Sequence, residues 1–383
     1  NDYLLRNPLG QRLPRKFKVN FSGCSTDCGQ AMFNDVGVVA ATRQRDDGTT
    51  EQGFRVYIAG GLGATPHPAL ALEDFTTREE LLPTIESVLR LFEQTGNRDN
   101  KLRARLKWVV DQLGIDEVRR RVIKIRHTLP ASSSWPGGLP PEVVAASDAP
   151  AGRSATGEVT AVGQGVRVEL RSSDPYVRWE QTSVIRGSAK GTVSAIAYAA
   201  LGDITASQFK SLAAIQRELG ADVRLTNRQN IAFRNLTEEQ LRKLYDGMAQ
   251  PGAELARDVV ACPGADTCNI AVTQSRGLAK AIGERLEDEG LAEVGGVRIN
   301  ISGCTNSCGQ HHAADIGLFG AERRAHGKSL PGYQLLVGGY VGEEQIHFGE
   351  KALRVPAKAA PEAVARVVRQ FSNERDAGET FQE

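Results

Sequence analysis

The chain has 383 residues, with 47 Lys and Arg against 46 Asp and Glu, so its formal net charge is only +1. This balance gives no support to a nucleic-acid or membrane-surface role, because both need a basic excess or patch. No apolar run approaches the ~20 residues of a membrane span, and the length suffices for about two or three domains with their own cores.

The first part of the chain is predicted to contain strands followed by a helix. Residues 17–23, 35–42 and 54–60 are rich in Val, Ile and Phe, which is typical of strands. Residues 76–96 predict a helix with threonine near its start and Gly96 at its end. Strands followed by helices indicate an α+β or α/β layered domain.

A second helix is predicted at residues 97–114. Leu102, Leu106 and Val109 share one face of this helix. Its basic residues are Arg98, Arg103, Arg105 and Lys107. They indicate either a solvated helix face or a surface that binds carboxylates through charge-assisted bonds.

The middle of the chain is predicted to be a linker and then a small domain. Residues 129–152 are rich in Pro, Ser, Gly and Ala and have no periodicity, which indicates a linker. Strand, helix, strand and helix follow over about 80 residues. The first helix is capped by Thr205 and ends at Gly220, one strand covers residues 223–236, and the second helix starts near Thr237.

An internal repeat dominates the layout. Residues 19–40 match residues 299–320 with an offset of 280 residues. Residues 53–63 then correspond to 332–342, and residues 86–92 to 365–371. The identical positions include Ser22, Gly23, Cys24, Cys28, Gly29, Gln30, Asp35 and Gly37. Such spacing indicates one folding unit used twice.

Four cysteines in two tight pairs stand in the last third of the chain. Cys262 and Cys268 form a C-x5-C pair, and Cys304 and Cys308 form a C-x3-C pair. Four thiolates suit a [4Fe–4S] cluster, with one sulfur for each iron. A disulfide scaffold is a weaker interpretation for a long chain poor in cysteine. Zinc and unligated thiols are the alternatives, although zinc pairs usually lie about two to four residues apart.

Two features beside these cysteines bear on the cofactor. Residues 269–290 predict a helix that starts at the cluster, where its N–H groups suit an anionic cofactor, and Arg276 could reach a carboxylate. His311 and His312 suggest a metal site, but sulfur already supplies four ligands and the other copy has Ala31 and Met32 there.

The pattern C-x5-C followed by G-C-x-N-x-C-G resembles the sirohaem-dependent nitrite and sulfite reductases. The resemblance covers nearly the whole chain and implies an α+β fold, with a pseudo-two-fold repeat of sirohaem/iron–sulfur reductase domains plus a ferredoxin-like half-domain. It implies a first, cluster-less repeat at 1–128 that is truncated at its N-terminus, a linker at 129–155, the half-domain at 156–250, and a second repeat at 251–383 that carries the cluster and the sirohaem ligand.

The resemblance also implies the cofactor ligands. Cys262, Cys268, Cys304 and Cys308 would hold the cluster, and Cys308 would also bridge to the sirohaem iron. Residues 226–230 match the family motif T-x-[RN]-Q-N, and on a single strand Thr226, Arg228 and Asn230 would project together. The expected sirohaem contacts are Arg15, Arg103, Arg105, Lys107, Thr226, Arg228, Gln229, Asn230 and Asn306.

The segment LPRKFK at residues 13–18 is the candidate for substrate chemistry. On a strand, Lys16 and Lys18 would point to the same side. Cations lower the cost of placing an anion and can donate protons. A solvated basic strand end is the other interpretation, but the resemblance implies that both lysines bind substrate and donate protons over the sirohaem iron.

The expected activity is therefore the six-electron reduction of sulfite to sulfide or of nitrite to ammonia, in the cytoplasm, where cysteines stay reduced. No flavin or nicotinamide motif is visible, so ferredoxin or a flavoprotein reductase is expected to supply electrons. The alternatives are a non-catalytic iron–sulfur electron carrier or scaffold without haem, and a zinc-stabilised structural domain.

The chain departs from the family at two places. The family is longer at the N-terminus, and this chain opens without Met, so we expect a fragment that lacks some arginines for substrate and sirohaem. Cys24 and Cys28 have no C-x5-C partner in this chain, and we interpret them as relics of the duplication.

Overall fold

The computed structural model describes residues 2–5, 7–23, 25–27, 29–135, 173–186, 193–248, 255–325, 327–342, 345–376 and 379–382. The chain divides into two units, Asn1–Ser154 with Gly342–Ile346, and Ala155–Val341 with His347–Glu383. Cys24, Cys28 and most of the predicted linker lie outside the described residues. Within the described ranges, no helix has the length and apolar character that a membrane crossing requires.

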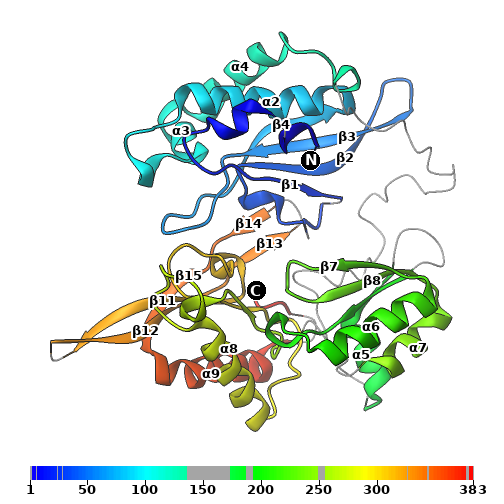
Figure 1. Ribbon diagram of the computed structural model, residues 1–383, viewed down its shortest axis with the longest axis vertical. Coiled ribbons are helices and arrows are strands. Elements are labelled where there is room, and N and C mark those ends of the chain that lie inside the picture. Colours follow the sequence, from blue (N-terminus) through cyan, green and yellow to red (C-terminus); the bar gives the residue numbers. More distant parts are fainter. Residues whose placement is uncertain are drawn as a thin grey trace. The chain divides into compact units, whose positions relative to one another are not determined.

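The first unit is built on one four-stranded sheet, blue in Figure 1. Its strands, in sheet order, are β1 (Val19–Ser22), β2 (Val36–Gln44), β3 (Thr50–Ile58) and β4 (Leu70–Thr77). Its α-helices are α1 (Asp2–Leu5), α2 (Arg78–Thr95), α3 (Leu106–Leu113) and α4 (Ile115–Arg126). β1 runs parallel to β2, and the other neighbours are antiparallel. Buried side chains of α2, including Val88 and Phe92, share a core with Val56 and Ile58 of β3.

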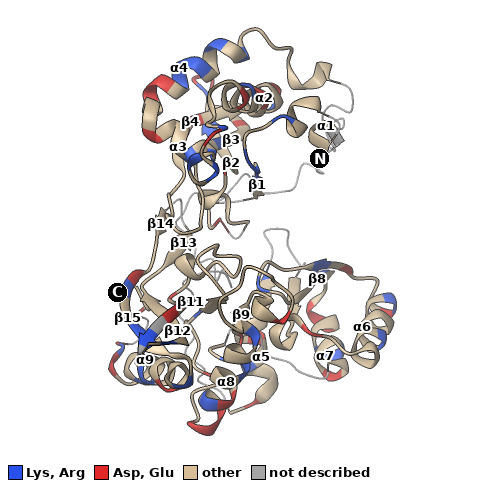
Figure 2. Cartoon of the chain, turned by 60° about the vertical axis from the view of Figure 1, so that its left-hand side comes forward, with Lys and Arg blue, Asp and Glu red and all other residues tan. Residues whose placement is uncertain are grey.

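Helix α2 begins and ends where the sequence predicts. Thr77 and Glu80 form a capping box at its start, and the N–H of Gly96 donates to the Phe92 carbonyl (2.9 Å) at its end. α4 is also complementary to its dipole, with Asp116 and Glu117 in the first turn and basic residues in the last. Charges of both signs are interspersed on α4 and α8 in Figure 2.

The single helix predicted at residues 97–114 is wrong. The chain forms a 3-10 turn, η3 (Lys101–Arg103), and α3 starts only after Arg105. The Asn100 side chain accepts the N–H of Leu102 (3.0 Å), which separates the turn from the helix. Leu106 and Val109 are buried, but Leu102 is 87% exposed and does not share their face.

The second unit contains a four-stranded antiparallel sheet, green in Figure 1, in the part of the chain predicted to be the half-domain. Its strands, in sheet order, are β5 (Val184–Arg186), β6 (Val193–Ala197), β8 (Ile231–Leu236) and β7 (Asp222–Leu225). Its helices are α5 (Pro175–Ser183), α6 (Ala206–Leu219) and α7 (Glu238–Gly247). Thr205 caps α6, and Gly220 ends it in the left-handed conformation, as predicted.

The single strand predicted at residues 223–236 is wrong, because the segment is a hairpin. β7 and β8 are joined by a turn at residues 226–230. The N–H of Thr226 donates to the Asn230 carbonyl (2.8 Å), and Gln229 has a positive φ of 65°. The motif residues therefore follow a turn and do not alternate along one strand.

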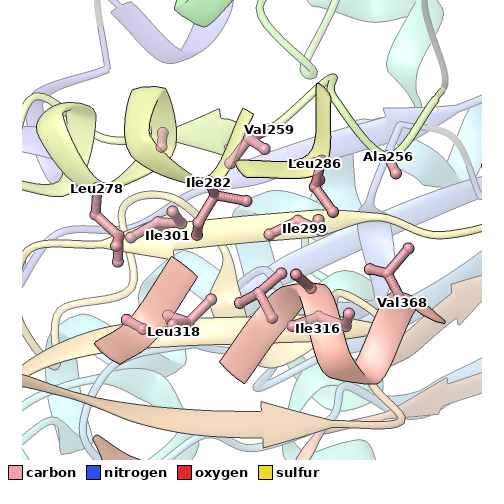
Figure 3. Packing of buried hydrophobic residues seen from close by; sticks show 14 of the residues in the cluster. Ala256, Val259, Leu278, Ile282, Leu286, Ile299, Ile301, Ile316, Leu318 and Val368 are labelled. Carbon is pink, nitrogen blue, oxygen red and sulfur yellow. The ribbon is translucent and has the colours of Figure 1, made fainter. Parts of the chain in front are cut away.

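The second repeat lies in the second unit and has a five-stranded sheet. Its strands, in sheet order, are β15 (Glu350–Pro356), β12 (Lys328–Val337), β11 (Ile316–Ala325), β10 (Ile299–Ser302) and β9 (Val260–Ala261). Its helices are α8 (Ser275–Asp288) and α9 (Ala360–Glu374). Two short strands, β13 (Tyr340–Gly342) and β14 (Gln345–His347), form a separate sheet, and residues Gly342–Ile346 are grouped with the first unit. Figure 3 shows Ile282, Ile299, Ile301, Ile316 and Val368 pointing into one buried cluster.

The internal repeat is confirmed in the strand registers. β1 pairs with β2 in parallel with Val19 opposite Val36, and β10 pairs with β11 with Ile299 opposite Ile316. Both pairs are related by the same offset of 280 residues. Short 3-10 turns, η2 (Ala31–Phe33) and η7 (His311–Ala313), occupy equivalent places. The same local fold is therefore formed twice.

Candidate functional site

The two cysteine pairs meet at one edge of the second unit's sheet. Cys262 directly follows β9, and Cys304 stands two residues after β10. β9 and β10 are parallel neighbours, with Ala261 opposite Ile301, so their carboxyl ends lie at the same edge. The N–H of Cys262 donates to the Ile301 carbonyl (3.1 Å). The topology thus joins two motifs that are far apart in the sequence.

Gly303 connects the two cysteine loops through backbone hydrogen bonds. Its carbonyl accepts the N–H groups of Val272 (2.8 Å) and Thr273 (3.2 Å), and its own N–H donates to the Cys262 sulfur (3.2 Å). In the first loop, the N–H of Cys268 donates to the Gly264 carbonyl (2.9 Å). The loops are therefore organised by backbone hydrogen bonds as well as by any shared ligand.

The donor set fits an iron–sulfur cluster. The four thiols are free of disulfides, and Cys308 is the most exposed of them. The Gly303 N–H reaches the sulfur of Cys262, and such bonds stabilise thiolate charge and tune a cluster's potential. Within the described residues, no group of three His, Cys, Asp or Glu side chains suits a single metal ion. A [4Fe–4S] cluster does not require the four sulfur atoms to converge on one metal ion, because each thiolate binds a different iron.

Helix α8 starts beside the first cysteine and not directly after the second, which corrects the predicted helix start. The hydroxyl of Ser275, its first residue, donates to the Cys262 carbonyl (2.6 Å) and lies 3.3 Å from the sulfur. Arg276 pairs with Asp203, so its guanidinium is already engaged within the unit.

Alanine at Gly303 is expected to loosen the cysteine loops. An added Cβ would lie 2.8 Å from the Thr273 carbonyl oxygen and 2.9 Å from the Gly264 Cα, both backbone atoms that cannot swing away. We expect the Gly303→Ala chain to retain less cluster, measured as iron and acid-labile sulfide after anaerobic purification. Gly283→Ala is the matched control, because a Cβ on this α8 residue would meet nothing within 4 Å. Equal iron content in the two variants would contradict this role of Gly303.

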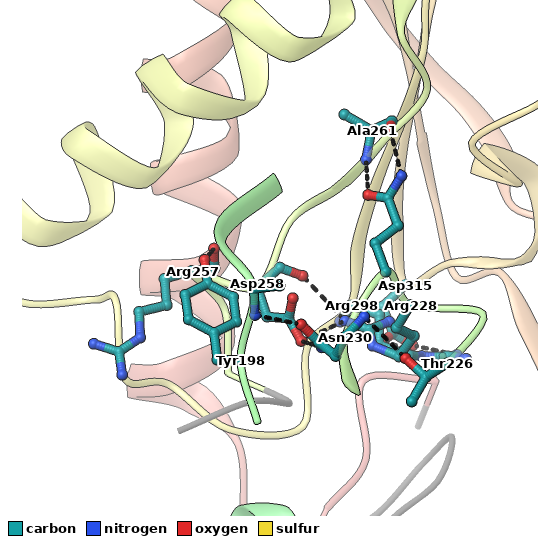
Figure 4. A network of polar contacts seen from close by, with 11 residues as sticks. Tyr198, Thr226, Arg228, Asn230, Arg257, Asp258, Ala261, Arg298 and Asp315 are labelled. Carbon is teal, nitrogen blue, oxygen red and sulfur yellow. Dashed lines mark hydrogen bonds and ion pairs between the residues drawn. The ribbon is translucent and has the colours of Figure 1, made fainter. Parts of the chain in front are cut away.

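The turn at residues 226–230 is hydrogen-bonded to β9, the strand that leads to Cys262 (Figure 4). The Gln229 amide donates to the Ala261 carbonyl (2.9 Å) and accepts the Ala261 N–H (3.3 Å). The Asn230 amide donates to the Asp258 carboxylate (2.8 Å). An Arg228 nitrogen donates to the Asp258 carbonyl (3.1 Å). The motif therefore couples the half-domain to the first cysteine, and Asp258 is a participant that sequence reasoning missed.

The basic segment of the first unit is not a strand at the two lysines. β1 begins at Val19, and Lys16 and Lys18 precede it in irregular backbone, with exposed side chains like that of Arg15. The N–H of Lys18 donates to the Asp35 carboxylate (3.1 Å), and its carbonyl accepts the Val36 N–H (3.0 Å). These bonds fix the backbone of Lys18 against the start of β2.

The residues of the predicted R-x-R-x-K surface have three different environments. Arg103 is exposed, with its guanidinium 5.2 Å from the Trp108 ring centre. Arg105 forms an ion pair with Asp35 (2.7 Å), which is fully buried. Lys107 is only 4% exposed and donates to the Thr65 carbonyl. The structure does not bring these three cations onto one helix face.

Burial, and to a smaller extent the nearby charge of Arg105, lowers the pKa of Lys107 to about 8. The unfolded chain holds this proton up to a pKa of about 10.4, so it binds more protons than the folded chain between these values. Stability should therefore rise with pH in this window and be flat below it. We expect urea denaturation at pH 7.5 to 10 to show a smaller rise for Lys107→Met than for the unmodified chain. Parallel curves would contradict the burial of this charge.

The remaining predicted residues lie on the second cysteine loop and just after it. Asn306 is exposed between Cys304 and Cys308, whereas His311 and His312 are buried. Burial lowers the pKa of His311 to about 2, with a smaller effect of His312. His311 is therefore neutral at physiological pH. The two rings are in contact with their planes tilted by 46° and their centres 4.1 Å apart.

Two known protein families match the chain. Residues 1–128 and 252–382 match the nitrite and sulphite reductase 4Fe-4S domain, and residues 187–251 match the nitrite/sulfite reductase ferredoxin-like half domain. Together these matches account for most of the chain.

Individual proteins are similar to the chain over most of its length. The chain is 31% identical to the assimilatory ferredoxin-dependent nitrite reductase of Haloferax mediterranei, over 97% of this chain and 61% of that protein. It is 29% identical to the ferredoxin–nitrite reductase of Synechococcus elongatus, over 95% and 64% of the two proteins. The structure of the Mycobacterium tuberculosis NirA protein matches with a TM-score of 0.73 at 24% identity, over 100% of this chain and 65% of that one, which shows a shared fold. The chain thus spans less than two thirds of the length of these relatives.

Proposed function

Because the chain belongs to the nitrite and sulphite reductase 4Fe-4S family, an oxidoreductase family, we propose that it forms the cofactor-bearing part of an anion reductase. The protein would reduce nitrite to ammonia, or sulfite to sulfide, by six electrons. The observation that carries this proposal is the meeting of Cys262 and Cys304 at the ends of two paired parallel strands. Four thiols presented from these two loops are the donor set that a [4Fe–4S] cluster requires.

Each cysteine loop has a separate task in this proposal. Cys262, Cys268 and Cys304, which are partly buried, would ligate the cluster. Cys308 is exposed and would ligate both the cluster and the sirohaem iron. Sirohaem, when bound, would supply the iron at which the anion is reduced. The Gly303 N–H would stabilise negative charge on the Cys262 sulfur at each change of cluster charge.

The remaining residues would bind the sirohaem carboxylates and the substrate. Arg15 and Arg103 are exposed arginines that suit carboxylates, and Asn306 offers an exposed amide beside Cys308. In the turn at residues 226–230, Thr226 and Arg228 would approach the same cofactor, while Gln229 and Asn230 hold the turn in place. Arg105 and Lys107 are engaged inside the first unit, so we leave them out of this set.

Lys16 and Lys18 would bind the anion and supply protons. Both residues are exposed, and the backbone of Lys18 is fixed by Asp35 and Val36. A cation held in place before the substrate arrives stabilises developing negative charge without reorganisation. It can also donate protons as the anion's oxygens leave as water.

Nitrite is the preferred substrate and ferredoxin the preferred electron donor, acting in the cytoplasm. Both choices rest on relatives that are named ferredoxin-dependent nitrite reductases. The test is steady-state reduction of nitrite and of sulfite by the protein produced with sirohaem, using reduced ferredoxin and, separately, an artificial reductant. Nitrite turnover with ferredoxin at a higher kcat/KM than sulfite turnover is expected. Turnover of neither anion with either donor would contradict the proposal and favour a haem-free electron carrier.

A further inference from the structure

Ser275 places one hydroxyl group between two acceptors of the same cysteine. Its Oγ donates to the Cys262 carbonyl at 2.6 Å and lies 3.3 Å from the Cys262 sulfur. A serine hydroxyl carries a single hydrogen, so it can donate fully to only one acceptor at a time. A thiol can donate its own hydrogen, but a cysteine that binds metal is a thiolate and can only accept. In a cluster-bound chain, the carbonyl and the sulfur of Cys262 would therefore compete for one hydrogen.

The Ser275 hydroxyl is enclosed by the backbone of the cysteine loops. Ser275 is 0% exposed. Gly264 has a φ of 59°, and an added Cβ at this position would collide with the Ser275 Oγ. The Gly264 Cα in turn lies 2.9 Å from where a Cβ on Gly303 would stand. The hydroxyl is thus held away from bulk water, in surroundings of low polarity where a hydrogen bond to a charged sulfur is strengthened.

Tyr333 holds the backbone that precedes Ser275. Its side chain is buried, and its hydroxyl donates to the Gln274 carbonyl at 3.0 Å. The strand registers place Phe54 at the equivalent position of the first copy, where no hydroxyl is available. The phenolic hydroxyl therefore belongs to the copy that contains the four cysteines, and it fixes the turn from which Ser275 reaches Cys262.

We propose that Ser275 is a positioning residue that raises the reduction potential of the cluster through the Cys262 sulfur. When the electron donor supplies one electron, negative charge on the sulfur increases, and the Ser275 hydroxyl turns from the carbonyl toward the sulfur. Its proton stays on the serine oxygen, so no covalent bond is made or broken. The Gly303 N–H, at 3.2 Å, is the second donor to the same sulfur. This inference rests on the proposed function, because it requires a bound cluster.

The direct test is the reduction potential of the cluster in Ser275→Ala, measured on the holoenzyme by a redox titration followed by electron paramagnetic resonance. Hydrogen bonds to cluster sulfurs stabilise the more negative, reduced state. We expect the equilibrium constant for one-electron reduction to fall about tenfold, which lowers the potential by about 59 mV. The iron and acid-labile sulfide content should stay unchanged.

Thr273→Val is the matched control. The Thr273 hydroxyl is also buried in the first cysteine loop, but it donates to the Gly303 carbonyl at 3.4 Å. Valine has nearly the same shape as threonine and removes only the hydroxyl, so the potential should equal that of the unmodified protein. Equal shifts in the two variants would show that the loss of any buried hydroxyl in this loop changes the potential, and would overturn the specific role of Ser275.

Pulsed electron paramagnetic resonance in D2O keeps the test decisive if Ser275→Ala loses its cluster. In the reduced, unmodified holoenzyme we expect at least two exchangeable deuterons coupled to the cluster, one from the Ser275 hydroxyl and one from the Gly303 amide. A single coupled deuteron would overturn the inference.

The same measurements separate this inference from the proposed function. An unchanged potential in Ser275→Ala, with full cluster content, would overturn the role of Ser275 and leave the proposed reductase intact. Absence of a cluster from the unmodified protein would instead reject the proposed function, and the inference with it.

Discussion

Replacing Cys308 with serine is expected to abolish anion reduction while leaving the fold intact. Cys308 is exposed, so the change removes a ligand without opening a cavity in the core. A serine oxygen is a poorer ligand for cluster iron than a thiolate, and the proposed bridge to the sirohaem would be lost with it. We expect kcat/KM for nitrite to fall by at least about 100-fold, by analogy with the loss of metal-site residues. Electron paramagnetic resonance and absorption spectra would report the two cofactors separately.

Thr305→Ala is the matched control for Cys308. Thr305 is exposed in the same loop, between Cys304 and Asn306, and has no proposed ligand role. Its variant should keep both the cofactors and the activity. If Cys308→Ser retained activity close to that of Thr305→Ala, the assignment of Cys308 as the bridging ligand would be wrong.

Alanine at Lys18 is expected to impair catalysis more than cofactor binding. The Lys18 side chain is exposed, and its backbone bonds to Asp35 and Val36 do not depend on its ammonium group. Loss of one preorganised cation or proton donor costs about 10²–10³-fold in rate. We therefore expect kcat/KM for nitrite to fall by about this factor in Lys18→Ala, with unchanged sirohaem absorption.

Lys101→Ala provides the comparison for a general effect of positive charge. Lys101 is an exposed cation in the same unit, within η3. Its replacement by alanine should leave kcat/KM for nitrite unchanged. Lys18→Arg keeps the charge but alters its geometry and donor strength, so an intermediate rate is expected. An equal fall of kcat/KM in Lys18→Ala and Lys101→Ala would show that only the net positive charge of the protein matters. It would contradict the role of Lys18 in binding the substrate.

The parts of the fold that repeat or carry strong local signals could be predicted from the sequence. The offset of 280 residues predicts two copies of one unit, and the registers at Val19 and Ile299 confirm it. Helix α6 follows from a threonine cap and a terminal glycine. These features depend on local chemistry or on self-similarity, which a single sequence displays directly.

The errors arose where a short polar side chain redirected the backbone. Asn100 accepts a backbone N–H and separates a 3-10 turn from α3. The spacing of Leu102 and Leu106 therefore predicted one continuous helix where the chain forms a turn and then a helix. The Thr226 hydroxyl accepts the N–H of Asn230 (3.0 Å) and supports a turn inside what reads as one strand. Hydrogen-bonding side chains of this kind compete with regular structure and leave little trace in apolar periodicity.

The site was predictable as a set of chemical groups but not as a set of contacts. The cysteine spacing identifies the donors, whereas the roles of Gly303 and Asp258 depend on which strands become neighbours. Asp35 could have been noticed, because it is identical in both copies of the repeat. Its pairing with Arg105, however, joins residues 70 positions apart and needs the fold.

The central claim is that this chain holds a [4Fe–4S] cluster coupled to sirohaem through Cys308. The most direct measurement is the absorption spectrum of the protein produced in a sirohaem-supplying host, with iron and acid-labile sulfide assayed on the same sample. We predict macrocycle bands together with about five irons and about four sulfides for each chain. A colourless protein that contains zinc, or cluster iron without macrocycle absorption in the full-length protein, would contradict the claim.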